Sequence, residues 1–148
     1  MVERFERFTY ALSEINRYWH KIAGDEMSKY DLKGPFAFYL TVLYRHHDGV
    51  TSVELGKLCD KNKADVSRAV SLLEEKGMVV RVGNNQSLYR AKIKLTDKGN
   101  FAAEQVQKAA VRAVEIGGDG LSDEHREIFY SVLERIAGNL KDVSQAGL

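Results

Sequence analysis

The segment from Thr51 to Val82, TSVELGKLCDKNKADVSRAVSLLEEKGMVVRV, constrains the fold of this chain more than any other. Thr51 and Glu54 form a capping box pattern, in which each side chain bonds a backbone amide that the helix start leaves unpaired. Asn62 is suited to cap a second helix, and Gly77 suits the left-handed position after that helix ends. The segment therefore predicts two helices joined by a tight turn at Asp60–Lys61.

The residues after Gly77 predict a β-hairpin. MVVRV is typical of a strand, GNNQS of an exposed turn, and LYRAKIKL of a second strand in which apolar and basic residues alternate. One face of this hairpin is expected to be buried and the other to be basic. Two helices joined by a tight turn and followed by a two-stranded ribbon make a winged helix-turn-helix.

Helical periodicity covers most of the remaining chain. From Val2 to Gly24, apolar residues recur at alternating steps of three and four, as in a helix that packs along another helix. Gly24 is expected to end that helix, and residues 27–34 are expected to form a loop or a short helical turn. Further helices are expected after Pro35, from Thr96 to Ile116, and after Ser122. We predict a mainly α fold of about six helices with a small β-hairpin wing.

Positive charge is concentrated in the middle of the chain. Residues 57–98 contain ten lysines and arginines but five acids, a net charge of +5, whereas the remainder carries −4. Such a distribution favours a surface that binds a polyanion. Chance segregation of ordinary surface charge is the alternative.

The second helix of the motif has two different faces. Val66, Ala69, Val70 and Leu73 form an apolar stripe that is expected to be buried. The opposite face carries small or cationic residues, which allow a helix to approach base edges in a major groove. Arg68 can bond guanine O6 and N7, and Lys63 and Ser67 can hold phosphates. The predicted DNA contacts are Lys61, Asn62, Lys63, Ala64, Ser67, Arg68, Ser71, Asn85, Gln86, Arg90 and Lys92. A plain solvated helix face is the alternative.

Two stretches resemble the MarR family of winged-helix transcriptional regulators: VTSVELGKLCDKNKADVSRAVSLLEEKGMVVR and KIKLTDKG. The resemblance extends over nearly the whole chain in its order of elements. It implies a homodimer that binds a palindromic operator, and the expected function is that of a repressor. Residues 1–148 would form one MarR-like domain, with the DNA-binding lobe at 34–98 and a helical dimerisation region at 1–30 and 99–148. Predicted interface residues are Phe5, Phe8, Leu12, Phe129, Ile136 and Leu140.

The tip of the wing departs from the family pattern. Family members commonly carry Asp-x-Arg there, whereas this chain has Asn85-Gln86-Ser87. Arg90 is close enough in sequence to substitute, but it could instead contact a phosphate from the strand. The missing arginine also supports an alternative function, a winged helix that binds protein and not DNA.

Aromatic residues are concentrated in the first two helices. The resemblance implies a small aromatic or phenolic effector, and Tyr10, Trp19, Phe36 and Tyr39 are the candidate lining of its pocket. Packing in the core and in a dimer is the alternative explanation for these side chains.

Other function classes have little support in the sequence. Cys59 is expected to be a buried apolar residue, and the four dispersed histidines suggest no metal site and no cofactor. A dimeric sensor of metal or oxidant is a further alternative. No catalytic motif is present, so we expect no enzyme. No apolar run is long enough to span a membrane, and the charged N-terminus is unlike a signal peptide, which favours a cytoplasmic protein.

Overall fold

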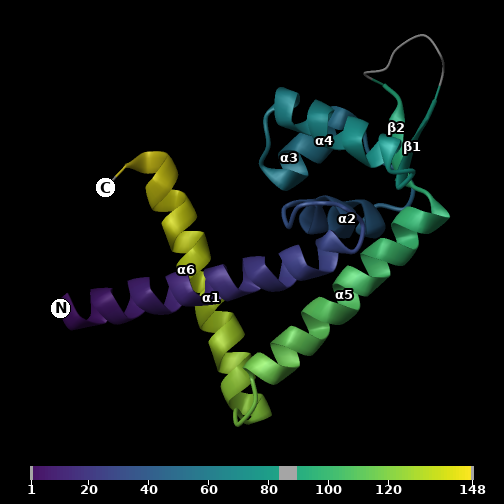
Figure 1. Ribbon diagram of the computed structural model, residues 1–148. Coiled ribbons are helices and arrows are strands. Elements are labelled where there is room, and N and C mark those ends of the chain that lie inside the picture. Colours follow the sequence, from purple (N-terminus) through teal and green to yellow (C-terminus); the bar gives the residue numbers. More distant parts are fainter. Residues whose placement is uncertain (1, 84–89, 148) are drawn as a thin grey trace. The chain divides into compact units, whose positions relative to one another are not determined.

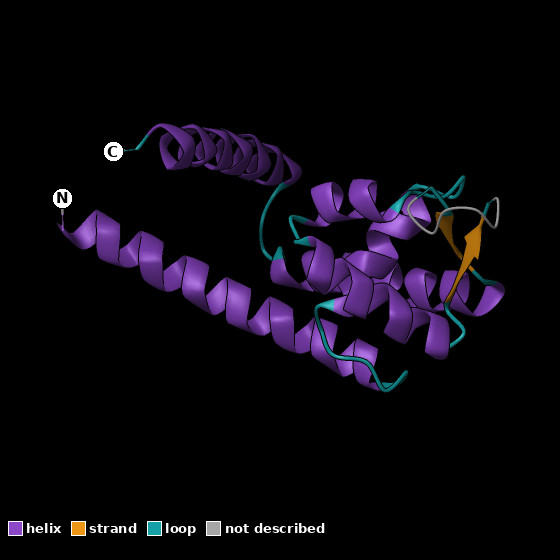
Figure 2. Cartoon of the chain, turned by 90° about the horizontal axis from the view of Figure 1, so that it is seen from above, coloured by secondary structure: helices purple, strands orange, loops and turns teal. Residues whose placement is uncertain are grey.

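The computed structural model describes residues 2–83 and 90–147 (Figures 1 and 2). These residues form helices α1 (Val2–Ser28), α2 (Phe36–Arg45), α3 (Ser52–Cys59), α4 (Lys63–Glu75), α5 (Asp97–Gly117) and α6 (Asp123–Ala146), with strands β1 (Val79–Val82) and β2 (Lys92–Leu95). The prediction of a mainly α fold with a hairpin wing is confirmed. The chain divides into two compact units, residues 1–111 and 112–148.

The first helix is longer than predicted. The prediction that Gly24 ends it is wrong, because α1 continues to Ser28. Met27 is fully buried in the core of the first unit, and Glu26 beside it is buried as well. Burial of this last turn offsets the low helix propensity of a glycine, which costs about 1 kcal/mol relative to alanine. The left-handed residue Asp31, with a φ of 54°, lies in the turn that follows.

The core of the first unit collects side chains from α1 to α5 and both strands. Its fully buried large residues are Met27, Leu40, Leu43, Leu55, Leu73, Met78, Ile93, Val66 and Val70. All four residues of the predicted apolar stripe of α4 are buried. In α3, by contrast, Val53 and Leu58 are exposed, and Leu55, Gly56 and Cys59 form the buried face.

Local hydrogen bonds set the ends of α3 and α4 as the sequence predicts. The backbone N–H of Thr51 donates to Glu54 Oε2 at 2.8 Å, and the Glu54 N–H donates to Thr51 Oγ1 at 3.2 Å. Asn62 Oδ1 accepts from the Asp65 N–H at 2.8 Å. Between these helices Asp60 adopts a left-handed φ of 51°, and Gly77 follows α4 with a φ of 71°.

The wing strands are antiparallel, with Val79 opposite Leu95 and Val82 opposite Lys92. An isolated bridge between Val50 and Ile93 adds a third chain segment to this sheet. The second strand begins at Lys92, later than the predicted run LYRAKIKL, and Arg90 lies in a turn.

A short junction links the end of α4 to the start of α5. The Thr96 hydroxyl donates to the Gly77 carbonyl at 2.6 Å and accepts from the Gly99 N–H at 3.1 Å. Lys98 Nζ donates to the Lys76 carbonyl at 2.8 Å. The Leu-Thr-x-x-Gly stretch therefore caps one helix at its start and the other at its end.

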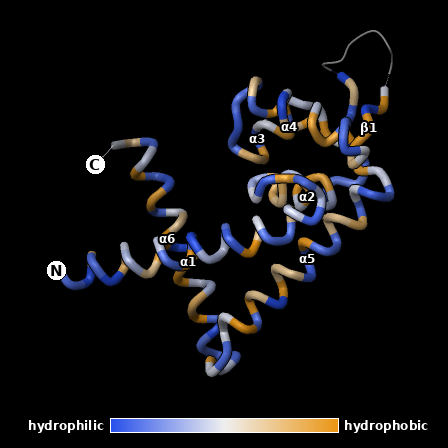
Figure 3. The backbone as a smooth tube through the Cα atoms, in the orientation of Figure 1, coloured by the Kyte–Doolittle hydropathy of each residue, from blue (hydrophilic) through white to orange (hydrophobic). Residues whose placement is uncertain are grey.

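Apolar side chains on α1 and α6 remain exposed in the single chain. Figure 3 shows hydrophobic and hydrophilic residues recurring along both helices. Within the first unit, Phe5, Phe8 and Leu12 are exposed, and in the second unit α6 has no buried residue. The turn before α6 is held by Arg126, which donates to Glu115 Oε2 and to the Gly118 carbonyl, both at 2.9 Å.

Candidate nucleic-acid interface

A groove of about 1070 Å³ is lined by residues of α3, the following turn, α4 and β1. Five of the predicted DNA contacts line it: Lys61, Asn62, Lys63, Ser67 and Ser71. Lys57 and Arg81 add two more cations, whereas Asp60 and Glu74 are the acidic residues of the lining. The groove is therefore net positive, as a surface that meets phosphates requires.

The predicted contact face of α4 divides into two parts. Lys63, Ser67 and Ser71 recur every four residues and lie along the groove. Ala64 and Arg68 are also exposed but do not line it. Ala64, Ser67 and Ser71 keep this face low in profile, whereas the apolar stripe of α4 points into the core.

Arg68 is held by a neighbour on its own helix. Its Nη2 donates to Asp65 Oδ1 at 2.6 Å, while the Arg68 side chain is 74% exposed and that of Asp65 is 41% exposed. The guanidinium thus lies at the surface in a defined orientation and faces solvent.

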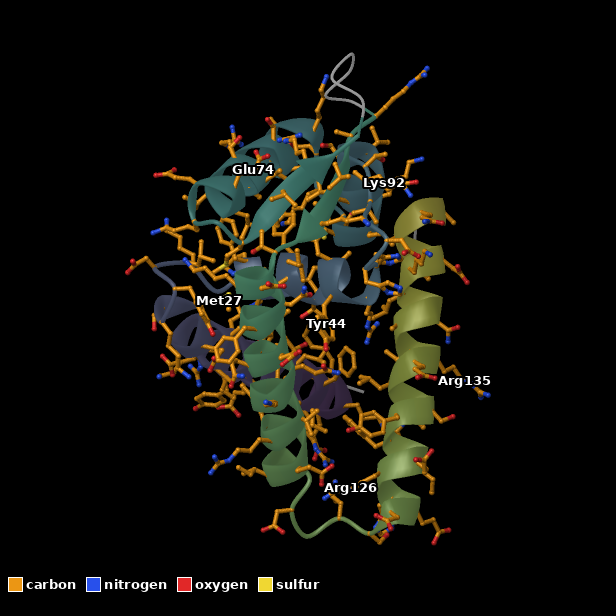
Figure 4. The ribbon with its side chains drawn as sticks, turned by 90° about the vertical axis from the view of Figure 1, so that its right-hand side faces the viewer. Met27, Tyr44, Glu74, Lys92, Arg126 and Arg135 are labelled. Atoms are coloured by element: carbon orange, nitrogen blue, oxygen red, sulfur yellow. The ribbon has the colours of Figure 1, made fainter. Side chains whose placement is uncertain are left out.

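The wing contributes two further basic residues, which lie outside the groove lining. Arg90 and Lys92 are exposed, and Lys92 belongs to β2 (Figure 4). Asn85 and Gln86, the other two predicted wing contacts, lie outside the described residues.

Among the groove residues whose side chains can donate a hydrogen bond to a phosphate, sequence reasoning missed three: Ser52, Lys57 and Arg81. Arg81 donates from Nε to Glu74 Oε1 at 3.0 Å, which joins β1 to α4. Two signals could have identified these cations. Lys57 and Arg81 both belong to the positive segment 57–98, and Arg81 is the last residue of the helix-turn-helix stretch that resembles the MarR family.

The four candidate effector residues do not form one site in the single chain. Phe36 and Tyr39 are in ring contact, with centroids 6.0 Å apart, and Tyr39 is buried. Burial raises the pKa of the Tyr39 phenol. Tyr10 and Trp19 are exposed on α1. A shallow hollow at Trp19 is lined by Leu12, Ser13, Ile15 and Asn16 and contains none of the other three candidates.

Cys59 is buried, as predicted, and burial raises the pKa of its thiol. A thiol with a raised pKa forms less of the reactive thiolate. Within residues 2–83 and 90–147, no group of three or more His, Cys, Asp or Glu side chains is placed to hold a metal ion. No described helix combines the length and the apolar character that crossing a membrane requires.

Comparison with known proteins relates the helix-turn-helix region of this chain to a known family. A family model described as MarR family matches residues 30–86. YdgJ of Bacillus subtilis (strain 168), named as an uncharacterized HTH-type transcriptional regulator, is 31% identical over 104 residues. That match covers 70% of this chain and 63% of YdgJ, so the chain spans less than two thirds of this relative's length.

Solved structures share the fold over most of the chain. A MarR transcriptional regulator from Methanosarcina mazei Go1 has a TM-score of 0.78 and 25% identity, covering 93% of this chain and 92% of that one. A complex of MepR from Staphylococcus aureus with DNA has a TM-score of 0.77 and 22% identity, covering 89% and 97%. The named relatives are regulators and none is an enzyme, which agrees with the sequence prediction. Residues 30–86 of the chain match the MarR family, and the fold of the chain is that of the solved MarR-family regulators.

Proposed function

We propose that this protein is a sequence-specific DNA-binding transcriptional regulator. The observation that carries the proposal is the outer face of α4, where small and cationic side chains stand beside a net positive groove. α4 would enter the major groove, with Arg68 at base edges and with Lys61, Lys63 and Lys92 at phosphates. The likeness in fold to a regulator solved in complex with DNA, MepR, supports DNA binding by this chain.

The active form would be a homodimer on a palindromic operator, and its effect would be repression. The exposed apolar residues of α1 and α6 support a dimer, because solvent exposure of such seams is unfavourable. Two copies of α4 would then read half-sites about one helical turn apart, roughly 10 bp. Sedimentation equilibrium tests this part, and Leu12→Asp together with Leu140→Asp is expected to give monomers.

An aromatic or phenolic effector would act on this dimer. The exposed Trp19 and its hollow on α1 are one part of the candidate pocket, and the Phe36–Tyr39 pair is the other. A ligand that prefers a dimer with a different spacing of its α4 helices would release DNA. Quenching of Trp19 fluorescence by salicylate, with parallel loss of DNA binding, is the expected result. Unchanged fluorescence and unchanged DNA binding across phenols and aromatic carboxylates would contradict it.

The decisive experiment is a fluorescence-anisotropy titration with DNA from the protein's own upstream region and a scrambled duplex as competitor. We expect specific binding that weakens steeply with salt, because lysines and arginines release counterions from DNA. Arg68→Ala should lower specific affinity by about 10-fold or more, the usual range for losing one bidentate base contact. Arg135→Ala, an exposed residue of α6 (Figure 4), is the matched control and should leave affinity unchanged.

Absence of binding to any duplex at low salt would refute the proposal and favour a winged helix that binds protein. The unusual wing sequence Asn85-Gln86-Ser87 is the feature that supports this second function.

A further inference from the structure

We propose that Asp65 is a positioning residue for DNA readout, which holds Arg68 for a guanine base and disfavours contacts to phosphate alone. The inference rests on the proposed DNA-binding function. It adds that the α4 face selects guanine. It assigns a role to an acidic side chain beside the predicted contact residues of α4, which are themselves small or basic.

The first step is geometric. Asp65 Oδ1 accepts from Arg68 Nη2 at 2.6 Å, a short charge-assisted hydrogen bond. The residue that carries this carboxylate is itself anchored, because its backbone N–H donates to Asn62 Oδ1 at 2.8 Å. The Asn62 cap, Asp65 and Arg68 therefore form one connected unit at the start of α4.

The second step concerns the donors that remain. A guanidinium has five N–H donors in a rigid planar fork, and the bond to Asp65 uses one of them. Guanine O6 and N7 accept two parallel N–H bonds from such a fork. Because Asp65 restricts the Arg68 side chain before DNA arrives, less conformational freedom is lost on binding than for an unheld arginine.

The third step concerns charge. The Asp65 carboxylate is partly exposed on the face that would meet DNA, and it repels phosphates within a Debye length of about 8–10 Å. When the protein sits on DNA so that α4 faces only phosphates, this repulsion is not offset by any base contact. A register that places guanine at Arg68 gains the bidentate pair, so the acid increases the difference between right and wrong sites.

The alternative is that Asp65 and Arg68 form an ordinary surface ion pair, which contributes little to stability and nothing to DNA readout. Two experiments distinguish a positioning role from an ordinary ion pair. The preferred sequence is first selected from a randomised duplex library. Anisotropy then measures binding to the selected duplex and to duplexes in which each guanine is replaced in turn. We expect Asp65→Asn to lower the preference for guanine at one position by about 10-fold, within the range of a single base contact. Binding to scrambled duplex should strengthen in the same variant.

Asp31→Asn is the matched control. It removes the same charge from the same unit and breaks another ion pair, between the exposed Asp31 and the half-buried Lys76 at 3.6 Å. Asparagine tolerates the positive φ of 54° at this position, so the backbone should be kept. This variant is expected to retain the full guanine preference, which separates a general charge effect from an effect through Arg68.

A double-mutant cycle tests whether Asp65 acts through its partner. Arg68→Lys removes the planar fork, so Asp65→Asn should cause no further loss of guanine preference in that background. An equal loss in both backgrounds, or an unchanged base preference in the single variant, would overturn the inference. A wild-type protein that selects no sequence at all would instead refute the proposed function. Thermal unfolding by circular dichroism establishes that each variant is folded.

Discussion

Arg81 on β1 lies 3.0 Å from Glu74 on α4, joined by an ion pair between Nε and Oε1. The side chains are 21% and 34% exposed, so the pair is partly shielded from water. It fixes the first wing strand against the helix that carries the predicted base contacts, and it places a guanidinium at the edge of the groove.

Glu74→Gln is expected to lower the free energy of unfolding by about 1 kcal/mol, since it weakens a partly shielded charged hydrogen bond. Urea denaturation provides the measurement. Glu75→Gln is the control, because the Glu75 side chain is exposed and has no hydrogen bond or ion pair within the described part of the chain. Equal losses in the two variants would show that the pair contributes nothing.

Arg81→Ala should weaken binding to duplexes of any sequence and reduce the salt slope of log K by about 0.9, the value for one lost phosphate contact. Lys108→Ala on α5 removes an exposed cation away from the groove lining and should leave the slope unchanged. The titration is anisotropy at several salt concentrations. A loss confined to one operator sequence would instead indicate a base contact.

Gly99→Ala is expected to be strongly destabilising. A Cβ at this position would collide with the carbonyl oxygen of Met78, at the junction where Thr96 links α4 to α5. Overpacking of this kind costs about 1–3 kcal/mol of folding free energy, and the Met78 backbone cannot move away as a flexible side chain could. In Gly24→Ala, by contrast, the new methyl meets nothing within 4 Å, and the helix should gain about 0.5–1 kcal/mol. Urea denaturation of both variants checks the opposite signs.

The Cys59 thiol should react slowly with a disulfide reagent in the native protein and rapidly in urea. Burial raises its pKa, which lowers the thiolate fraction, and the core of the first unit limits access. Rapid native reaction at neutral pH, with loss of DNA binding, would support the oxidant-sensing alternative.

The α3 capping box should make stability depend on pH through Glu54. The backbone N–H and the hydroxyl of Thr51 lower the pKa of the Glu54 carboxyl below its ordinary value of 4.5. A group with a lowered folded pKa contributes stability above its unfolded pKa and loses that contribution as pH falls through the folded value. The stability difference between wild type and Glu54→Ala should therefore shrink below pH 4.5. Denaturation of both proteins across a pH series tests this.

The outer face of α4 could be predicted from the sequence, whereas the Arg81–Glu74 ion pair could not. The α4 stripe at Val66, Ala69, Val70 and Leu73 is buried as its spacing indicated, so the outward position of Ser67 and Arg68 followed directly. The Arg81–Glu74 pair could not be found in the same way. Its partners are seven positions apart, one in a helix and one in a strand, and no local rule brings them together.

The sequence by itself determined the helix starts and the buried face of α4. Caps such as Thr51–Glu54 and Asn62–Asp65 act within one turn, so their hydrogen bonds are specified by neighbouring residues alone. Tertiary structure decided that α1 continues past Gly24 and that Arg81 reaches the groove. In both cases the deciding free energy comes from groups outside the local turn of chain: the core that buries Met27, and the carboxylate on another element that meets Arg81.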